Sequence, residues 1–220
     1  MKSFVIYVDT SNKSTESAKY TQSIFKDNLN INVNLFKGVN ADNVWQTFID
    51  SNFNILDVKR FGAGNIDAEI ATFFSHYNLW LKCIELNEPI LILEHDAIIS
   101  DELDLDILKN FKGDLLNLGK PNWGSWFYGQ RESEWLTKEV GISKRQICKN
   151  EHDIYQVWNN GYCHCDSMWL FGAHGYLLNP IGAQKLVKEV KKGILPADVY
   201  IRTTLLDIYD YLPHPISQNT

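Results

Sequence analysis

The chain has 220 residues, of which 45% are hydrophobic and 22% are charged. This balance is typical of globular proteins and excludes disordered, collagen-like and repeat architectures. The 21 basic and 27 acidic residues give a formal net charge of −6, and no run of like charges is long enough to capture nucleic acid or a membrane surface. A chain of this length can bury a core without disulfides or metal, so we expect a single domain over residues 1–220.

The amino terminus and the cysteines indicate the compartment. Only five apolar residues stand between Lys2 and Asp9, too few for the apolar core of a signal peptide or for a membrane span. The four cysteines are irregularly spaced, which favours reduced thiols over a disulfide framework. We therefore expect a soluble, cytoplasmic protein.

The first third of the chain predicts a β-α-β unit. Residues 4–8 (FVIYV) form a nearly continuous apolar run, as in a strand covered on both faces. A helix is expected beyond Ser14 and Ser17. Residues 31–36 then alternate between apolar and polar side chains, which predicts a second strand beside the first after a right-handed crossover.

The clearest helix is predicted over residues 67–87, with Asp67 at its start as a cap. Apolar residues recur there at steps of three and four and form one stripe: Ile70, Phe73, Phe74, Tyr77, Leu81 and Ile84. Pro89 cannot continue the helix, and the apolar run at 90–93 (ILIL) predicts a central strand.

That strand ends in three polar residues, Glu94, His95 and Asp96. In open α/β sheets, ligands bind at the carboxyl ends of the strands. Glu94 and Asp96 are two residues apart and point to the same side, so together they can hold one hard divalent cation, Mg²⁺ or Mn²⁺, next to diphosphate oxygens. The alternative is that a buried strand simply ends in charged loop residues.

The second half contains weaker patterns. We expect an amphipathic stretch at 103–111, a strand at 114–118, apolar runs within 168–179, a helix from Pro180, a short helix from Pro196 and an edge strand at 208–212. Residues 120–166 lack periodicity and are rich in Trp and Tyr. They form either a satellite core or an acceptor platform on which sugar rings or bases stack.

Several blocks, in order, resemble glycosyltransferase family 25, the family of lipooligosaccharide galactosyltransferases in lipopolysaccharide biosynthesis and of their collagen-modifying relatives. Residues 69–80 (EIATFFSHYNLW) and 88–99 (EPILILEHDAII) resemble its GEIGC-type start, Ser-His pair, helix and apolar strand ending in Glu-Asp-Asp. The similarity continues at 114–119 (DLLNLG), 172–187 (GAHGYLLNPIGAQKLV), 195–201 (LPADVYI) and 209–213. It covers most of the chain outside the aromatic segment.

The resemblance implies a GT-A-like (Rossmann-like) α/β domain with a central, mostly parallel sheet flanked by helices. It implies an inverting, hexosyltransferase-like enzyme with a UDP-sugar donor, a Mn²⁺ or Mg²⁺ cofactor and a hydroxyl acceptor on a glycan, a protein or a modified nucleobase. The metal ligands implied are Asp96, Glu94 and a late histidine, His214. The donor-binding residues implied are Asp9, Glu69, Ser75, His76, Glu94, Asp96 and His174.

Transfer with inversion needs a base that takes the proton of the attacking hydroxyl. Asp198, just after Pro196, is the candidate, and its alternative role is an ordinary helix cap. The histidines also have alternative roles: His76 as a hydrogen-bonded structural residue, His174 as part of a turn between glycines, and His214 as a surface residue.

Two other functions remain open. His95 replaces the middle Asp of the family's triplet, and the first loop lacks the Arg that often follows the family's Asn-Leu-Asp motif, so the chain could bind a nucleotide sugar without turnover. A zinc-stabilised interaction module is the other possibility, because four soft ligands lie close in sequence: Cys148, His152, Cys163 and Cys165.

Overall fold

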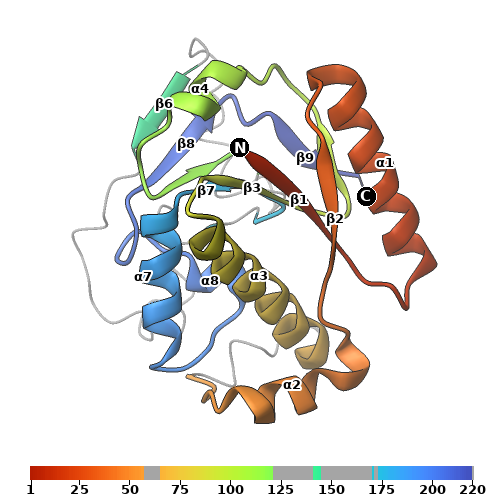
Figure 1. Ribbon diagram of the computed structural model, residues 1–220, viewed down its shortest axis with the longest axis vertical. Helices are drawn as coiled ribbons and strands as arrows, with labels where there is room; N and C mark the ends of the chain where they lie inside the picture. Colours follow the sequence, from red (N-terminus) through yellow and green to blue (C-terminus); the bar gives the residue numbers. More distant parts are fainter. Residues whose placement is uncertain (57–64, 121–140, 145–169, 171–172, 220) are drawn as a thin grey trace, which may run out of the picture.

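The computed structural model describes residues 1–56, 65–120, 141–144, 170 and 173–219. Its centre is a seven-stranded sheet with the strand order β2-β1-β3-β7-β5-β8-β6 (Figure 1). The strands are β1 (Lys2–Tyr7), β2 (Val33–Lys37), β3 (Ile90–Glu94), β5 (Leu115–Asn117), β6 (Gly141–Lys144), β7 (Gly175–Leu178) and β8 (Ile208–Leu212). Five of them run in one direction, whereas β6 and β7 run against them. The expected α/β class with a central, mostly parallel sheet is confirmed.

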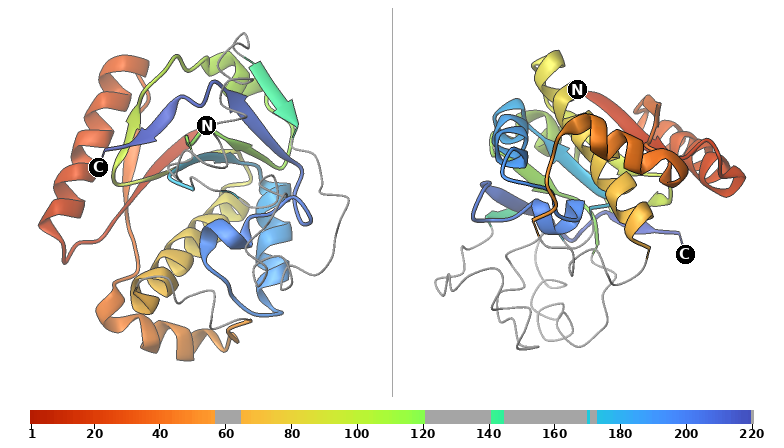
Figure 2. Two further views of the ribbon diagram at one scale, coloured as in Figure 1. Left: turned by 180° about the vertical axis from the view of Figure 1, so that it is seen from behind. Right: turned by 90° about the horizontal axis from the view of Figure 1, so that it is seen from below.

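Helices cover both faces of this sheet (Figures 1 and 2). They are α1 (Asn12–Leu29), the short 3₁₀ helix η1 (Ala41–Asn43), α2 (Val44–Ser51), α3 (Ile66–Leu86), α4 (Leu105–Asn110), α7 (Pro180–Val190) and α8 (Ala197–Tyr200). Side chains of β3 alternate between the faces. Ile90 and Ile92 pack with α3, α7 and α8, whereas Leu91 and Leu93 pack with α1 and α4. The fully apolar run of β3 is thus explained by burial on both sides.

The predicted β-α-β unit is confirmed. β1 and β2 pair in parallel, from Ser3 opposite Val33 to Tyr7 opposite Lys37, and α1 connects them. The side chain of Ser11 accepts a hydrogen bond from the backbone N–H of Ser14 (3.2 Å) and caps α1. The helix therefore begins earlier than the serine pattern suggested.

The long helix α3 matches the prediction within one residue at each end, but Asp67 is not its cap. Asn65 precedes the helix in an extended conformation, and its side chain accepts hydrogen bonds from the N–H groups of Asp67 and Ala68 (3.0 and 3.3 Å). Asp67 is already helical, and its carboxylate accepts a hydrogen bond from Nε1 of Trp45 instead. A cap needs a non-helical backbone, which Asn65 supplies.

The predicted strand at 208–212 forms as β8, but it is not at the edge of the sheet. β8 lies between β5 and β6, because residues 141–144 pair with it in antiparallel register. A further ladder not predicted joins β4 (Ala97–Ile99) to β9 (Ile216–Gln218). Apart from β6, the aromatic segment 120–166 lies almost wholly outside the described residues.

One edge of the sheet, called the carboxyl edge below, collects most of the strand ends. The carboxyl ends of β1, β2, β3, β5 and β8 lie there, together with the amino end of the antiparallel β7. Backbone hydrogen bonds join neighbouring strands at this edge, from Glu94 N–H to the carbonyl of His174 and from Leu118 N–H to that of Gly175 (3.0 Å each). Among the described helices, none has the length and apolar character needed to cross a membrane.

Candidate active site

Glu94 ends β3 at this edge. Its side chain is 25% exposed, and its Oε1 lies 3.3 Å from Nε2 of the fully buried His76. Burial by itself raises the pKa of Glu94, but the hydrogen bond from His76, together with the electrostatic effect of the surrounding histidines, outweighs it, and the net shift is downward. Glu94 is therefore held as a carboxylate.

Asp96 behaves in the opposite way. Its Oδ1 is enclosed and has no hydrogen-bond partner among the described residues. Burial raises the pKa of Asp96, and the negative charge of Glu94 raises it further. An enclosed carboxylate oxygen without a partner is costly in a protein interior, and a cation would satisfy it.

The carboxylates at the end of β3 fit a hard divalent cation, because Mg²⁺ and Mn²⁺ prefer oxygen ligands. The described part of the chain contains no group of three or more His, Cys, Asp or Glu residues placed to hold a metal. Asp96 and Glu94 would thus supply a partial ligand set, and a bound cation would complete its shell with water or substrate oxygens.

Two more acidic residues, from distant parts of the chain, are linked to this site electrostatically. Asp198, in α8, accepts a hydrogen bond from the N–H of Val199 (2.9 Å), and burial followed by the charge of Glu94 raises its pKa. Glu69 lies in the first turn of α3, and its pKa is raised by burial and by the charge of Asp198. Its Oε2 is enclosed without a partner among the described residues. The charge of Glu94 thus acts on Asp198, and the charge of Asp198 acts on Glu69.

His174 lies directly before β7 at the same edge. Its buried ring has Nε2 at 3.3 Å from the carbonyl oxygen of Ile216, so Nε2 donates and carries the proton. Burial lowers the pKa of His174, against the opposing charges of Glu94 and Asp96. The structure therefore places this histidine beside the acidic residues.

His76 connects the site to the core. Its Nδ1 lies 2.9 Å from the hydroxyl of Tyr176, which also accepts a hydrogen bond from Nε1 of Trp80 (3.0 Å). Tyr176 and Trp80 were not among the residues expected from the sequence. The position of Trp80, four residues after His76, was a signal that the two share a helix face. Tyr176 had no such signal, because only the pairing of β3 with β7 brings it there.

A cavity of about 300 Å³ lies at the carboxyl ends of β1 and β2. Its lining consists of Asp9, Thr10, Lys37, Gly38, Val39, Asn40, Asn43 and Thr47. Asp9 forms an ion pair with Lys37 (2.6 Å), and this hydrogen bond lowers the pKa of Asp9. Asp9, which was expected to bind the donor, therefore lines a polar cavity at the carboxyl edge of the sheet.

Ser75 contacts the segment that lines this cavity. Its hydroxyl donates to the carbonyl of Ala71 (2.8 Å) and accepts from the N–H of Val39 (2.9 Å). A Cβ atom on Gly38 would lie only 2.9 Å from this hydroxyl, so glycine is needed for the close approach. Ser75 shapes the cavity wall and is not among the lining residues.

His214 lies at the carboxyl end of β8, where its Nε2 is 3.2 Å from Oδ1 of Asp210. The same oxygen accepts a hydrogen bond from the side-chain amide of Asn117 at the end of β5 (3.0 Å). Asn117 and Asp210 were not expected as site residues. Both stand as polar residues inside apolar strands, LLN and IYDYL, which was a usable signal. The metal-ligand role of His214 stays a prediction.

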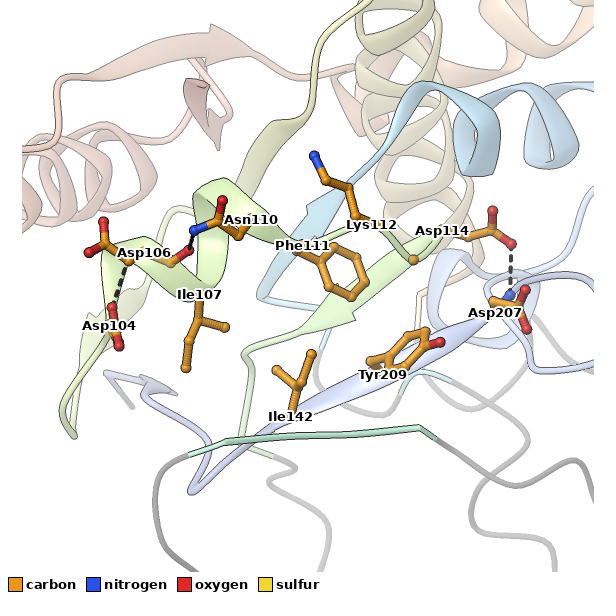
Figure 3. Close-up of a pocket in the computed structure, with 11 residues that line it drawn as sticks. Asp104, Asp106, Ile107, Asn110, Phe111, Lys112, Asp114, Ile142, Asp207 and Tyr209 are labelled. Carbon is orange, nitrogen blue, oxygen red and sulfur yellow. Dashed lines mark hydrogen bonds between the residues drawn. The ribbon is translucent and has the colours of Figure 1, made fainter.

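A larger cavity of about 670 Å³ lies at the opposite edge of the sheet, where β5 and β8 begin (Figure 3). Two of its carboxylates are already paired: Asp114 with Lys185 (2.6 Å) and Asp207 with Lys144 (2.5 Å). The Oδ2 of Asp114 also accepts the backbone N–H of Asp207 (2.8 Å). Asp114 and Asp207 thus form ion pairs and hydrogen bonds within the protein at the beginnings of β5 and β8. The larger volume of this cavity is therefore not enough to make it the candidate active site.

The candidate zinc ligands, Cys148, His152, Cys163 and Cys165, lie outside the described residues. Cys83 is the one cysteine that the structure describes. It is buried, and burial raises the pKa of its thiol to about 12. A thiol with that pKa is not a reactive nucleophile near neutral pH.

Comparisons with known proteins agree with the resemblance found in the sequence. Residues 1–201 match the family model described as glycosyltransferase family 25 (LPS biosynthesis protein). The procollagen galactosyltransferase 1 of Danio rerio is 24% identical over 151 residues, which are 68% of this chain and 21% of that protein. The chain thus spans about a fifth of the length of this curated relative.

Two solved structures are similar at low identity. The galactosyltransferase LgtC, crystallised with donor and acceptor sugar analogs, is 11% identical with a TM-score of 0.48, over 99% of this chain and 86% of that one. Mouse xyloside xylosyltransferase 1 in its apo form is 10% identical with a TM-score of 0.33, over 90% and 79% of the two chains. The match of the family model to nearly the whole sequence shows that the chain belongs to glycosyltransferase family 25.

Proposed function

We propose that this glycosyltransferase moves a sugar from a UDP-sugar to a hydroxyl acceptor, with a divalent cation and with inversion at the anomeric carbon. The observation that carries the proposal is that Glu94 and Asp96 follow one another at the carboxyl edge of the sheet and that the charge of Glu94 acts both on Asp96 and on Asp198. Ligands of α/β enzymes bind at this edge.

Asp96 is the residue we assign to the cation, because its enclosed Oδ1 lacks a partner among the described residues. Glu94 stands two residues away with one oxygen engaged by His76. When bound, Mn²⁺ or Mg²⁺ would offset the charge that develops on the departing nucleotide diphosphate. His174 would line the same donor site from the start of β7.

We assign the nucleoside end of the donor to the 300 Å³ cavity at the ends of β1 and β2. Its polar side chains, among them Asp9, Asn40 and Asn43, offer acceptors and donors for the edges of a base and a ribose. The cavity belongs to the same edge of the sheet as Glu94, so one extended donor can occupy both places.

Asp198 is the proposed general base. Burial and the charge of Glu94 raise its pKa above the ordinary aspartate value of 3.8, which makes it a better proton acceptor. An acceptor hydroxyl placed against Asp198 would lose its proton as its oxygen attacks the anomeric carbon. The acceptor is a glycan in our first proposal; a protein hydroxyl or a modified nucleobase is the alternative acceptor.

The test is transfer by purified protein with a panel of nucleotide sugars, UDP-galactose first because the curated relative is named a galactosyltransferase. We expect UDP release and a glycosylated product with Mn²⁺, and neither with EDTA. NMR of the anomeric proton in the product reports the stereochemistry. Turnover that survives EDTA contradicts the metal role, and retained configuration contradicts inversion.

A second candidate is nucleotide-sugar binding without transfer. It is favoured by His95, which stands where the family pattern has a carboxylate, so the triplet offers two acidic ligands and not three. Thermal stabilisation by UDP with Mn²⁺, without product from any donor and acceptor tested, would support this candidate.

A further inference from the structure

A chain of hydrogen bonds runs from the core to the active-site edge. Trp80, Tyr176 and His76 are all fully buried. The Tyr176 hydroxyl lies 3.0 Å from Nε1 of Trp80 and 2.9 Å from Nδ1 of His76. Nε2 of His76 then lies 3.3 Å from Oε1 of Glu94. The chain joins α3, β7 and β3.

The direction of this chain follows from the donors and acceptors that each group offers. The indole N–H of Trp80 can only donate, so the Tyr176 oxygen accepts from it. The Tyr176 hydroxyl has one hydrogen of its own, and this hydrogen finds an acceptor among the described residues only if Nδ1 of His76 accepts it. That leaves the ring hydrogen of His76 on Nε2, where it is donated to Glu94.

The reverse direction fails on two counts. A hydrogen on Nδ1 would leave the hydroxyl hydrogen of Tyr176 without a partner among the described residues, inside the core. If the ring is neutral, a hydrogen on Nδ1 also leaves Nε2 unprotonated. Its lone pair then faces the carboxylate of Glu94, and no hydrogen bond forms between them. The first direction leaves every donor and acceptor in the chain satisfied.

We propose that Tyr176 is a positioning residue of the donor site: it holds His76 as the Nε2–H tautomer and, through it, fixes one oxygen of Glu94. The exposed part of Glu94 is thereby held in one orientation at the carboxyl edge of the sheet. The effect of Tyr176 on donor binding rests on the proposed function, whereas the tautomer of His76 does not depend on that function.

The structure also supplies a matched control. Tyr200 is another fully buried tyrosine, and its ring stacks on the indole of Trp80 (5.7 Å between centroids, 25° between planes). Its hydroxyl has no hydrogen-bond partner among the described residues. Tyr200→Phe removes a buried hydroxyl from a ring that packs on the same Trp80, and it leaves the hydrogen bonds from Trp80 to Glu94 intact.

The first experiment measures the tautomer directly. Protein labelled with ¹⁵N-histidine is studied by long-range ¹H–¹⁵N NMR at pH 7.5, and the His76 signals are assigned by their absence in His76→Gln. We expect a protonated Nε2 and an unprotonated Nδ1. A proton on Nδ1, alone or together with Nε2, overturns the proposal whether or not the protein transfers sugar.

The second experiment separates positioning from packing. With UDP-galactose and Mn²⁺, Tyr176→Phe should raise the KM for the donor by about tenfold and leave the KM for the acceptor unchanged, whereas Tyr200→Phe should change neither. An unchanged donor KM in Tyr176→Phe, or an equal rise for the acceptor, overturns the proposal. If the wild-type protein shows no turnover, the proposed function fails and the NMR result alone decides on Tyr176.

Discussion

Nε2 of His76, in α3, lies 3.3 Å from Oε1 of Glu94, which ends β3 and comes 18 positions later in the chain. It explains why two neighbouring carboxylates differ. The hydrogen bond from His76 lowers the pKa of Glu94 in spite of its burial, whereas Asp96, which has no such donor, has a raised pKa. One carboxylate is stabilised by the protein, and the other has an enclosed oxygen without a hydrogen-bond partner among the described residues.

Asp96→Asn should abolish transfer without unfolding the protein. The amide removes the negative charge that would hold the cation. Burial and Glu94 raise the pKa of Asp96, so its ionised form is unfavourable in the folded state, and loss of this charge does not destabilise the fold at neutral pH. Stabilisation by UDP and Mn²⁺ in thermal melts should vanish as well. Asp106→Asn, an exposed residue at the opposite edge, is the control and should keep both properties.

Glu69→Gln should stabilise the protein at neutral pH. The pKa of Glu69 is raised above its ordinary 4.5 by burial and by Asp198, so the folded state binds the proton more tightly than the unfolded chain does. The stability that this group contributes is fully present below pH 4.5 and is lost as the pH rises through the raised pKa.

Urea unfolding of wild type and Glu69→Gln over a pH series checks this. The difference in unfolding free energy should favour the variant progressively as the pH rises above 4.5. A variant that is less stable than wild type at pH 7 would show that Glu69 has a stabilising partner.

Asp198→Asn should remove the chemical step and spare the binding of UDP-galactose. In the wild type, the rate should fall as the pH drops through the pKa of Asp198, which burial and Glu94 raise above 3.8. Measuring kcat against pH, and donor affinity by calorimetry for the variant, tests both statements. Unchanged kcat in the variant would assign the base to another residue.

Tyr176→Phe and Tyr200→Phe should differ in stability although both remove one buried hydroxyl. The first leaves the Nε1–H of Trp80 and Nδ1 of His76 without partners, at about 1–3 kcal/mol for each group. The second removes a hydroxyl without a partner among the described residues, so it should be neutral or stabilising. Equal losses in urea unfolding would contradict the hydrogen-bond chain.

Gly38→Ala should weaken donor binding and lower stability. The added Cβ would lie 2.9 Å from the Ser75 hydroxyl and 3.0 Å from Cγ2 of Ile6, so the floor of the 300 Å³ cavity must shift. We expect a loss of about 1–3 kcal/mol in unfolding free energy and a higher KM for UDP-galactose. If the unfolding free energy and the KM for UDP-galactose both stay at their wild-type values, the residues around Gly38 accommodate the added Cβ without loss of stability.

Much of the candidate site could be predicted from the sequence. The strand that ends at Glu94, with Asp96 two residues later, followed from one apolar run and the acidic residues after it, and the structure places both at the carboxyl edge of the sheet. His76 was weighed as a hydrogen-bonded residue and as site lining, and the structure shows that it bonds both the core and Glu94. The polar residues inside β5 and β8, Asn117 and Asp210, were visible in the sequence but were not recognised.

Local sequence patterns were enough to predict β1, α1, β2, α3 and β3 in order, together with the acidic end of β3, because periodicity and helix ends depend on neighbours a few residues apart. The tertiary structure decided that β8 lies inside the sheet, that Asn65 and not Asp67 caps α3, and that Tyr176 reaches His76. Strand pairing and buried hydrogen bonds join residues far apart in the chain, and the cap depends on backbone conformation, which local composition does not specify.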